Sequence, residues 1–95
     1  MTGEFLQTIL KTAQSKADKE GFSTLPDGAS LTLYLAHDGV GLTVNRVEAV
    51  RIQGNGVEAR VHSSKREVFM LELGDVFAVT LEGSIGSPPK RAGFG

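Results

Sequence analysis

The sequence contains no cysteine, and this absence removes several kinds of chemistry at once. Without a thiol group, the 95-residue chain forms no disulfide and offers no thiolate nucleophile. It also holds neither an iron–sulfur cluster nor a zinc ion bound through cysteine. A chain without disulfides fits a reducing compartment, so we expect a cytoplasmic location.

Aromatic residues and an excess of one charge are lacking as well. The chain has five Phe, one Tyr and no Trp. Proteins that bind single-stranded nucleic acid use aromatic side chains as stacking platforms, and few are present here. Ten Lys and Arg stand against eleven Asp and Glu, for a net charge of −1. No overall field therefore favours nucleic acid, anionic lipid or an acidic substrate.

Long hydrophobic runs are also absent. No stretch approaches the roughly 20 apolar residues that a membrane-spanning helix needs, so we expect no membrane association. The first residues lack the basic region and the apolar run of a signal peptide. A chain of 95 residues has room for one hydrophobic core. The sequence therefore predicts a single soluble domain, over residues 1–82, followed by a tail over residues 83–95.

The first third of the sequence has helical periodicity. Thr2 suits the N-cap position, and Gly21, followed by Phe22, suits a Schellman motif at the other end. These signals predict a helix over residues 4–20. Its apolar residues recur at spacings of three, four and seven, so they form one stripe along the helix. The stripe consists of Phe5, Leu6, Ile9, Leu10, Ala13 and Ala17.

After residue 28 the period changes to two, which predicts strands. Apolar residues alternate over residues 31–36, and Asp38-Gly39 is the signal of a two-residue type I′ hairpin. In the return strand the apolar residues change from even to odd positions at Val47. One extra residue flips every later side chain, so we predict a bulge or bend near Asn45-Arg46.

Three further strands follow. A turn at Gly54-Asn55-Gly56 leads into the alternating residues 57–62. Residues 68–73 are apolar at nearly every position, which predicts a central strand covered on both faces. Residues 76–81 form the last strand. The predicted fold is α+β: an N-terminal helix, then a five- to six-stranded antiparallel meander, curved or closed into a small SH3/Sm-like barrel.

Neither histidine stands in a pattern that indicates catalysis or metal binding. His37 precedes Asp38, but adjacent strand residues point to opposite faces, and the hairpin turn explains the aspartate. His37 and His62 lie far apart in the sequence without carboxylates at ligand spacing. The Gly-rich turns lie between strands, so they are not phosphate loops. We therefore predict no enzyme activity, no cofactor, no metal and no small-molecule substrate.

One part of the chain is similar to a known family. Tyr34-Leu35, Gly39-Val40 and Leu42 resemble the first hairpin of Sm-like RNA-binding proteins, which include the bacterial host-factor RNA chaperones. Residues 76–79, Val-Phe-Ala-Val, resemble their final strand, and the likeness spans residues 31–81. It implies a ring oligomer that binds RNA. The chain lacks the Asp-x-x-x-Asn and Tyr-Lys-His stretches of the family, so no base-reading residue carries over.

Two groups of residues are candidates for binding. The first group, a candidate nucleic-acid site, consists of basic residues of the meander: Arg46, Arg51, Arg60, Lys65 and Arg66. Glu48, Glu58 and Glu67 interleave with them, and this mixture of charges favours a solvated surface. The second group lies in the tail and consists of Pro88, Pro89, Lys90, Arg91 and Phe94. It is expected to combine extended backbone with two cations and one aromatic ring, as linear recognition segments do. A solubilising end of the chain can have the same composition.

The absence of catalytic patterns favours a non-catalytic protein-interaction or regulatory module. Such a module would act through a sheet edge, the helix face or the tail, with a protein partner or a second copy of itself. The alternative is an Sm-like small barrel that forms a ring and binds RNA.

Overall fold

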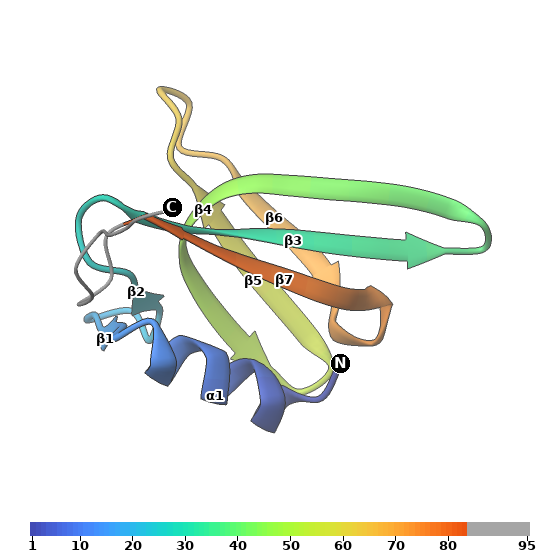
Figure 1. Ribbon diagram of the computed structural model, residues 1–95, viewed down its shortest axis with the longest axis horizontal. Helices are drawn as coiled ribbons and strands as arrows, with labels where there is room; N and C mark the ends of the chain where they lie inside the picture. Colours follow the sequence, from blue (N-terminus) through green and yellow to red (C-terminus); the bar gives the residue numbers. More distant parts are fainter. Residues whose placement is uncertain (84–95) are drawn as a thin grey trace, which may run out of the picture.

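The computed structural model describes residues 1–83 and confirms the predicted α+β class. One helix precedes seven strands, which form a mostly antiparallel sheet curled into a half-barrel (Figure 1). The candidate tail residues from Pro88 to Phe94 lie outside the described residues. Within the described residues, no helix is long and apolar enough to cross a membrane.

Helix α1 spans Gly3–Thr12 and begins as predicted. The Thr2 side chain accepts a hydrogen bond from the backbone N–H of Phe5 at 3.1 Å. The predicted end at residue 20 is wrong. Gln14 adopts a left-handed conformation with φ 62°, and Ser15 N–H donates to the carbonyl of Leu10 at 3.0 Å. This hydrogen-bond pattern is a Schellman motif, which closes the helix directly after Thr12.

The residues that follow form a hairpin instead of continuing the helix. Strand β1, Lys16–Ala17, pairs with β2, Ser23–Thr24. The Asp18 carboxylate accepts hydrogen bonds from the backbone N–H groups of Glu20 and Phe22, which fixes the turn. Gly21, with φ 88°, supplies the left-handed conformation of this turn and is no helix cap.

The central hairpin confirms the turn prediction. Strand β3, Ala29–His37, pairs with β4, Val40–Gln53, through a turn in which Asp38 has φ 50° and Gly39 has φ 81°. Both angles are positive, as a type I′ turn requires.

The predicted bend in β4 is also confirmed. Leu33 pairs with Val44, whereas Leu31 pairs with Val47, so β4 carries one extra residue. Arg46 lies within this bulge with φ 60°. The bulge bends β4, so that β4 belongs to both parts of the curled sheet. Its residues 40–47 pair with β3, and its residues 47–53 pair with β5.

The remaining strands leave the sheet open. β5, Gly56–Val61, pairs with β4 and with β6, Val68–Glu72. A 3₁₀ turn, η1 (Leu73–Asp75), leads into β7, Val76–Gly83, which crosses over to pair with β3. Within residues 1–83, β6 pairs only with β5 and β7 only with β3, so the barrel is not closed. The predicted central position of residues 68–73 is therefore wrong: β6 is an edge strand.

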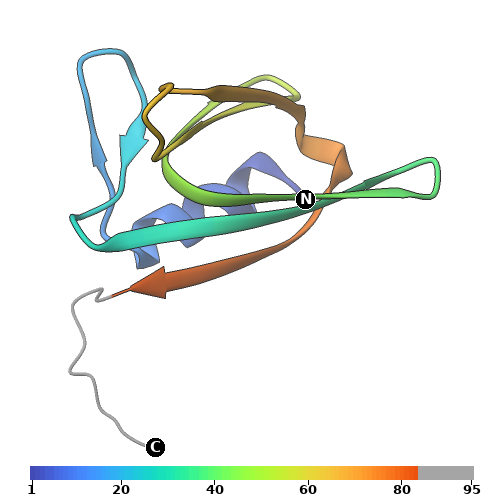
Figure 2. The ribbon, with the colours of Figure 1, turned by 90° about the horizontal axis from the view of Figure 1, so that it is seen from above.

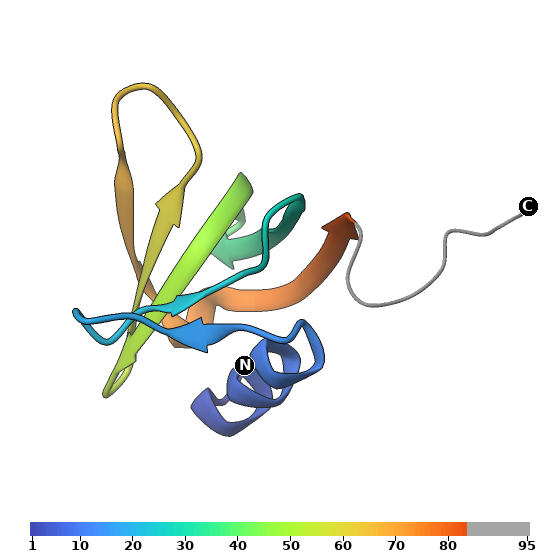
Figure 3. The ribbon, with the colours of Figure 1, turned by 90° about the vertical axis from the view of Figure 1, so that its left-hand side faces the viewer.

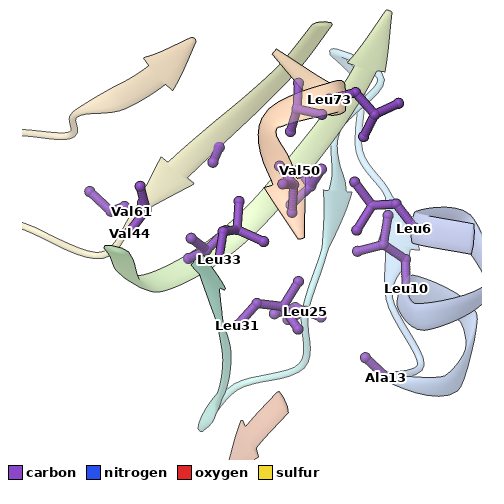
Figure 4. Close-up of a cluster of buried hydrophobic side chains, with 14 of the residues drawn as sticks. Leu6, Leu10, Ala13, Leu25, Leu31, Leu33, Val44, Val50, Val61 and Leu73 are labelled. Carbon is purple, nitrogen blue, oxygen red and sulfur yellow. The ribbon is translucent and has the colours of Figure 1, made fainter. Parts of the chain in front are cut away.

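The core fills the hollow of the curled sheet. From the helix, Leu6, Leu10 and Ala13 point toward side chains of the strands, among them Leu31 and Val50 (Figure 4). Two of the six residues predicted for the helix stripe do not face this core: Phe5 is 57% exposed, and Ala17 lies in β1. Thr12 ends the helix one turn before Ala17 could join the stripe.

Candidate functional site

Exposed apolar side chains gather on the free parts of the sheet. The β3–β4 hairpin continues past the rest of the domain as a long arm (Figures 1 and 2). Val40 and Leu42 lie on this arm, and Met70 lies on the edge strand β6. The large hydrophobic residues exposed within residues 1–83 are Phe5, Val40, Leu42, Val68, Met70 and Phe77.

Three of these exposed residues line a groove between the arm and β6, called here the arm groove. Its apolar surface comes from Leu35, Val40 and Leu42 on the arm and from Met70 and Leu71 on β6. The groove has a volume of about 570 Å³, within the range of ordinary binding sites. Its polar rim consists of His37, Asp38, Glu72 and Asp75.

The groove is a continuation of the core that no strand of the described residues covers. Leu35 pairs with Leu42 and His37 with Val40, so their side chains share the face of the buried Leu33. Exposure rises along this face from 0% at Leu33 and 5% at Leu35 to 48% at Leu42 and 70% at Val40. The reason is that pairing of β4 with β5 starts only at Val47, so β5 does not extend over the arm.

The rim of the arm groove carries more negative than positive charge. His37 lies 3.3 Å from the carboxylate of Asp38 and 3.0 Å from that of Asp75. The hydrogen bond with Asp75 and the charge of Asp75 raise the pKa of His37 above 6.5; burial opposes this rise, and the charge of Glu72 adds to it. With three carboxylates and one imidazole, the rim favours a cationic ligand.

We expect the pKa of His37 to fall toward 6.5 in Asp75→Asn and to change less in Asp38→Asn, because the hydrogen bond with Asp75 is the largest cause of the shift. A pKa raised by folding stabilises the protein most below the unfolded value. The free energy of unfolding should therefore decline as pH rises through the pKa of His37. Imidazole proton shifts in an NMR titration measure the pKa, and an equal change in both variants would contradict the assignment.

The predicted nucleic-acid site divides into two parts, and the first is ion-paired. Arg51 and Arg60 stack on the Phe22 ring, with guanidinium carbons 4.7 and 5.1 Å from its centroid. Arg51 pairs with Glu58, and the hydrogen bond from Arg51 lowers the pKa of Glu58. These contacts join the β1–β2 turn to β4 and β5.

Arg60 is held in the same way. Its side chain lies 3.0 Å from the carboxylate of Glu48 and 3.8 Å from that of Asp18. His62 also contacts Glu48, at 3.2 Å, and its side chain is 78% exposed, as the polar phase of its strand predicts. Carboxylates therefore offset the charges of Arg51 and Arg60, and both arginines hold elements together.

The other part of the predicted nucleic-acid site borders this cluster: Arg66 lines one cavity together with Arg60, and Arg46 lines another together with Glu48. Arg46 sits on the β4 bulge, and Lys65 and Arg66 lie in the β5–β6 loop, which projects on the side opposite α1 (Figure 3). All three are exposed, and none forms a salt bridge with another residue between 1 and 83. The two parts therefore differ in ion pairing: carboxylates hold Arg51 and Arg60, whereas the other three basic residues form no salt bridge within residues 1–83.

The main site residues that the sequence did not reveal are Asp75 and Met70. Asp75 is 38 positions from His37, and no sequence pattern links the two residues. In the described part of the chain, no three His, Asp or Glu side chains come close enough to hold a metal ion. Comparison of the chain with protein-family models, with curated proteins and with solved structures finds no match.

Proposed function

We propose that this protein is a non-catalytic interaction module whose arm groove binds an extended, basic and partly apolar segment of a partner polypeptide. The observation that supports this function best is the groove itself: an apolar surface continuous with the core, rimmed by three carboxylates. Three properties of the groove suit such a segment: its apolar side chains, its free backbone and its charge.

The apolar side chains provide affinity. Met70 is 76% exposed and Val40 is 70% exposed, and both border the groove. Burying a side chain of this size completely is favourable by about 1.5–3 kcal/mol. Covering Met70, Val40 and Leu42 with an apolar residue of a partner would recover part of this free energy, against the cost of association.

The free backbone favours an extended ligand. Strand β4 uses one edge for β3, and pairing of its other edge with β5 starts at Val47. On that second edge, the N–H and C=O groups of residues 40–45 have no strand partner within residues 1–83, so they can pair with an added strand. β-Strand addition of this kind gives main-chain hydrogen bonds, whereas neighbouring pockets select the side chains.

The charge of the rim selects the ligand. Asp38 and Glu72 are exposed, so they are available to Lys or Arg side chains of a bound segment. Charge pairs on a rim mainly increase the association rate and the specificity, and salt screens them. A basic segment should therefore bind this groove faster at low ionic strength than at high ionic strength.

Selection from a library of random 12-residue peptides displayed on phage tests this function. Selected peptides should combine Lys or Arg with aromatic or aliphatic residues. The double variant Leu42→Ser/Met70→Ser should weaken their binding about 30-fold, since two buried apolar contacts are lost. Phe77→Ser is the matched control, because Phe77 is 67% exposed but does not line the groove. No selected peptides, or equal losses in both variants, would contradict the proposal.

A second candidate function is an RNA-binding ring built by edge-to-edge association of copies of this chain. The observation in its favour is that β6 and β7 each keep one unpaired edge within residues 1–83, with Met70 and Phe77 exposed on them. Pairing β6 of one copy with β7 of the next joins copies head to tail, which gives a closed ring when the rotation closes.

Mass in solution tests this alternative. A closed hexamer or heptamer that Phe77→Ser dissociates would support it, and a monomer at micromolar concentration would remove it. RNA binding should then fall steeply with salt, and the triple variant Arg46→Glu/Lys65→Glu/Arg66→Glu should abolish it. Absence of binding to generic single-stranded RNA at low salt would remove the RNA function.

A further inference from the structure

We infer that the arm groove is occupied by the C-terminal segment of the same molecule, with Lys90 and Arg91 at the acidic rim and Phe94 on the apolar surface. This inference rests on the proposed function, because it names the segment that the groove binds. It follows from the reach of the segment, its charge and the free edge of the arm.

The segment is long enough to reach the groove. Strand β7 starts next to Asp75, a rim residue, and ends at Gly83 after seven residue steps, or about 23 Å. The eleven residues 84–94 span at most about 36–40 Å when extended. Gly83 has φ 103°, a conformation outside strand geometry that glycine adopts readily. Phe94 therefore has enough chain to return along β7 and pass Asp75.

The chemistry of the segment matches the groove. Lys90 and Arg91 carry two positive charges, against the rim carboxylates of Asp38, Glu72 and Asp75. Pro88 and Pro89 have no backbone N–H to donate, and the fixed φ of proline favours an extended backbone. The residues that follow them in the sequence each have a backbone N–H that can donate to the open edge of β4. The chain thus carries the combination of cations and an aromatic ring that the groove favours.

Attachment to the same chain makes a weak contact sufficient. A short connection within one chain gives an effective concentration in the millimolar range. A segment whose dissociation constant as a free peptide is about tenfold below this concentration, near 0.1 mM, would then occupy the groove about nine-tenths of the time. The consequence is competition: a segment bound nine-tenths of the time weakens binding of any other ligand about tenfold.

Paramagnetic relaxation in the full-length protein tests the contact. The chain has no cysteine, so Gly93→Cys provides a single site for a spin label. The amide signals of Val40, Leu42 and Met70 should broaden strongly, whereas those of the β5–β6 loop should not. In a mixture of isotope-labelled protein without spin label and unlabelled protein with it, the groove signals should stay sharp. Broadening in the mixture would place the segment on a second molecule and overturn the inference.

Variants in the full chain separate a specific contact from a random one. Phe94→Ser and Lys90→Glu should each remove most of the broadening, and Glu72→Lys should restore part of it in the Lys90→Glu chain, because the charge pair is exchanged. Broadening that is unchanged in Phe94→Ser would overturn the inference.

Peptide binding distinguishes this inference from the function on which it rests. The triple variant Lys90→Glu/Arg91→Glu/Phe94→Ser should bind the selected peptides about tenfold more tightly than the natural chain. Equal affinity, with peptide binding still dependent on Met70, would overturn the inference and leave the proposed function intact. If neither chain selects any peptide, the proposed function fails.

Discussion

Replacing Leu33 by alanine is expected to lower the free energy of unfolding by about 3–4 kcal/mol. Leu33 is completely buried, and its β3 position pairs with Val44 on one side and Val79 on the other. Its removal leaves a cavity where the two halves of the curled sheet face each other, and paired strands hold the walls of that cavity apart. Domains of this size are stable by only about 5–15 kcal/mol, so the loss is a large fraction of the total.

Leu42→Ala is the matched control for this prediction, because it makes the same chemical change on the same hairpin. Leu42 is 48% exposed and lines the arm groove, so its truncation should cost about 1 kcal/mol or less. Urea unfolding followed by circular dichroism measures both variants, provided that the slope with urea is unchanged. Equal losses of unfolding free energy in the two variants would contradict the prediction, because Leu42 would then be as buried as Leu33.

Features set by neighbouring residues could be predicted from the sequence. The N-cap at Thr2 needs only the first turn of the helix, and the hairpin at Asp38-Gly39 needs only two residues that tolerate positive φ. The bulge near Arg46 is visible because a shift of one residue changes the face of every apolar residue after it. In these places the local conformational preference and the tertiary structure agree.

The helix end could not be predicted because a long-range contact decides it. Residues 13–20 have a plausible helical pattern, and Gly21 is a plausible stop. The structure stops the helix at Gln14, which takes a left-handed conformation without being glycine. The segment after it pairs with a distant strand instead: Ser23 lies opposite Val50 and Thr24 opposite Ala49. Pairing of β1 with β2, and of β2 with β4, thus replaces about two turns of weak helix.

The position of β6 and the composition of the groove depend on topology. Residues 68–73 are apolar at every position but Glu72, and such a run fits a central strand. It becomes an edge strand because β7 crosses the sheet to β3. The same crossing brings Asp75 to His37, at 3.0 Å, across 38 positions of sequence. The apolar composition identified side chains that are expected to be buried. Only the strand order shows which of these side chains no neighbouring strand of the described residues covers.

Replacing Phe22 by alanine is the second change expected to have a large effect, at about 3 kcal/mol of the free energy of unfolding. Phe22 is only 6% exposed, although it lies outside the core cluster. The guanidinium groups of Arg51 and Arg60 lie over its ring. The substitution therefore removes an apolar anchor of the β1–β2 hairpin and the surface that keeps these two arginines in place.

Two further variants separate the contributions to this loss. Phe22→Leu keeps most of the apolar volume and removes the ring, so its cost of about 1–2 kcal/mol measures the two cation–π contacts. Phe5→Ala removes a phenylalanine that is 57% exposed and should cost less than about 1 kcal/mol. If Phe22→Ala costs no more than Phe5→Ala, the stacked ring does not hold the hairpin. Arg51 and Arg60 would then be freer to bind a ligand than their ion pairs with Glu58 and Glu48 imply.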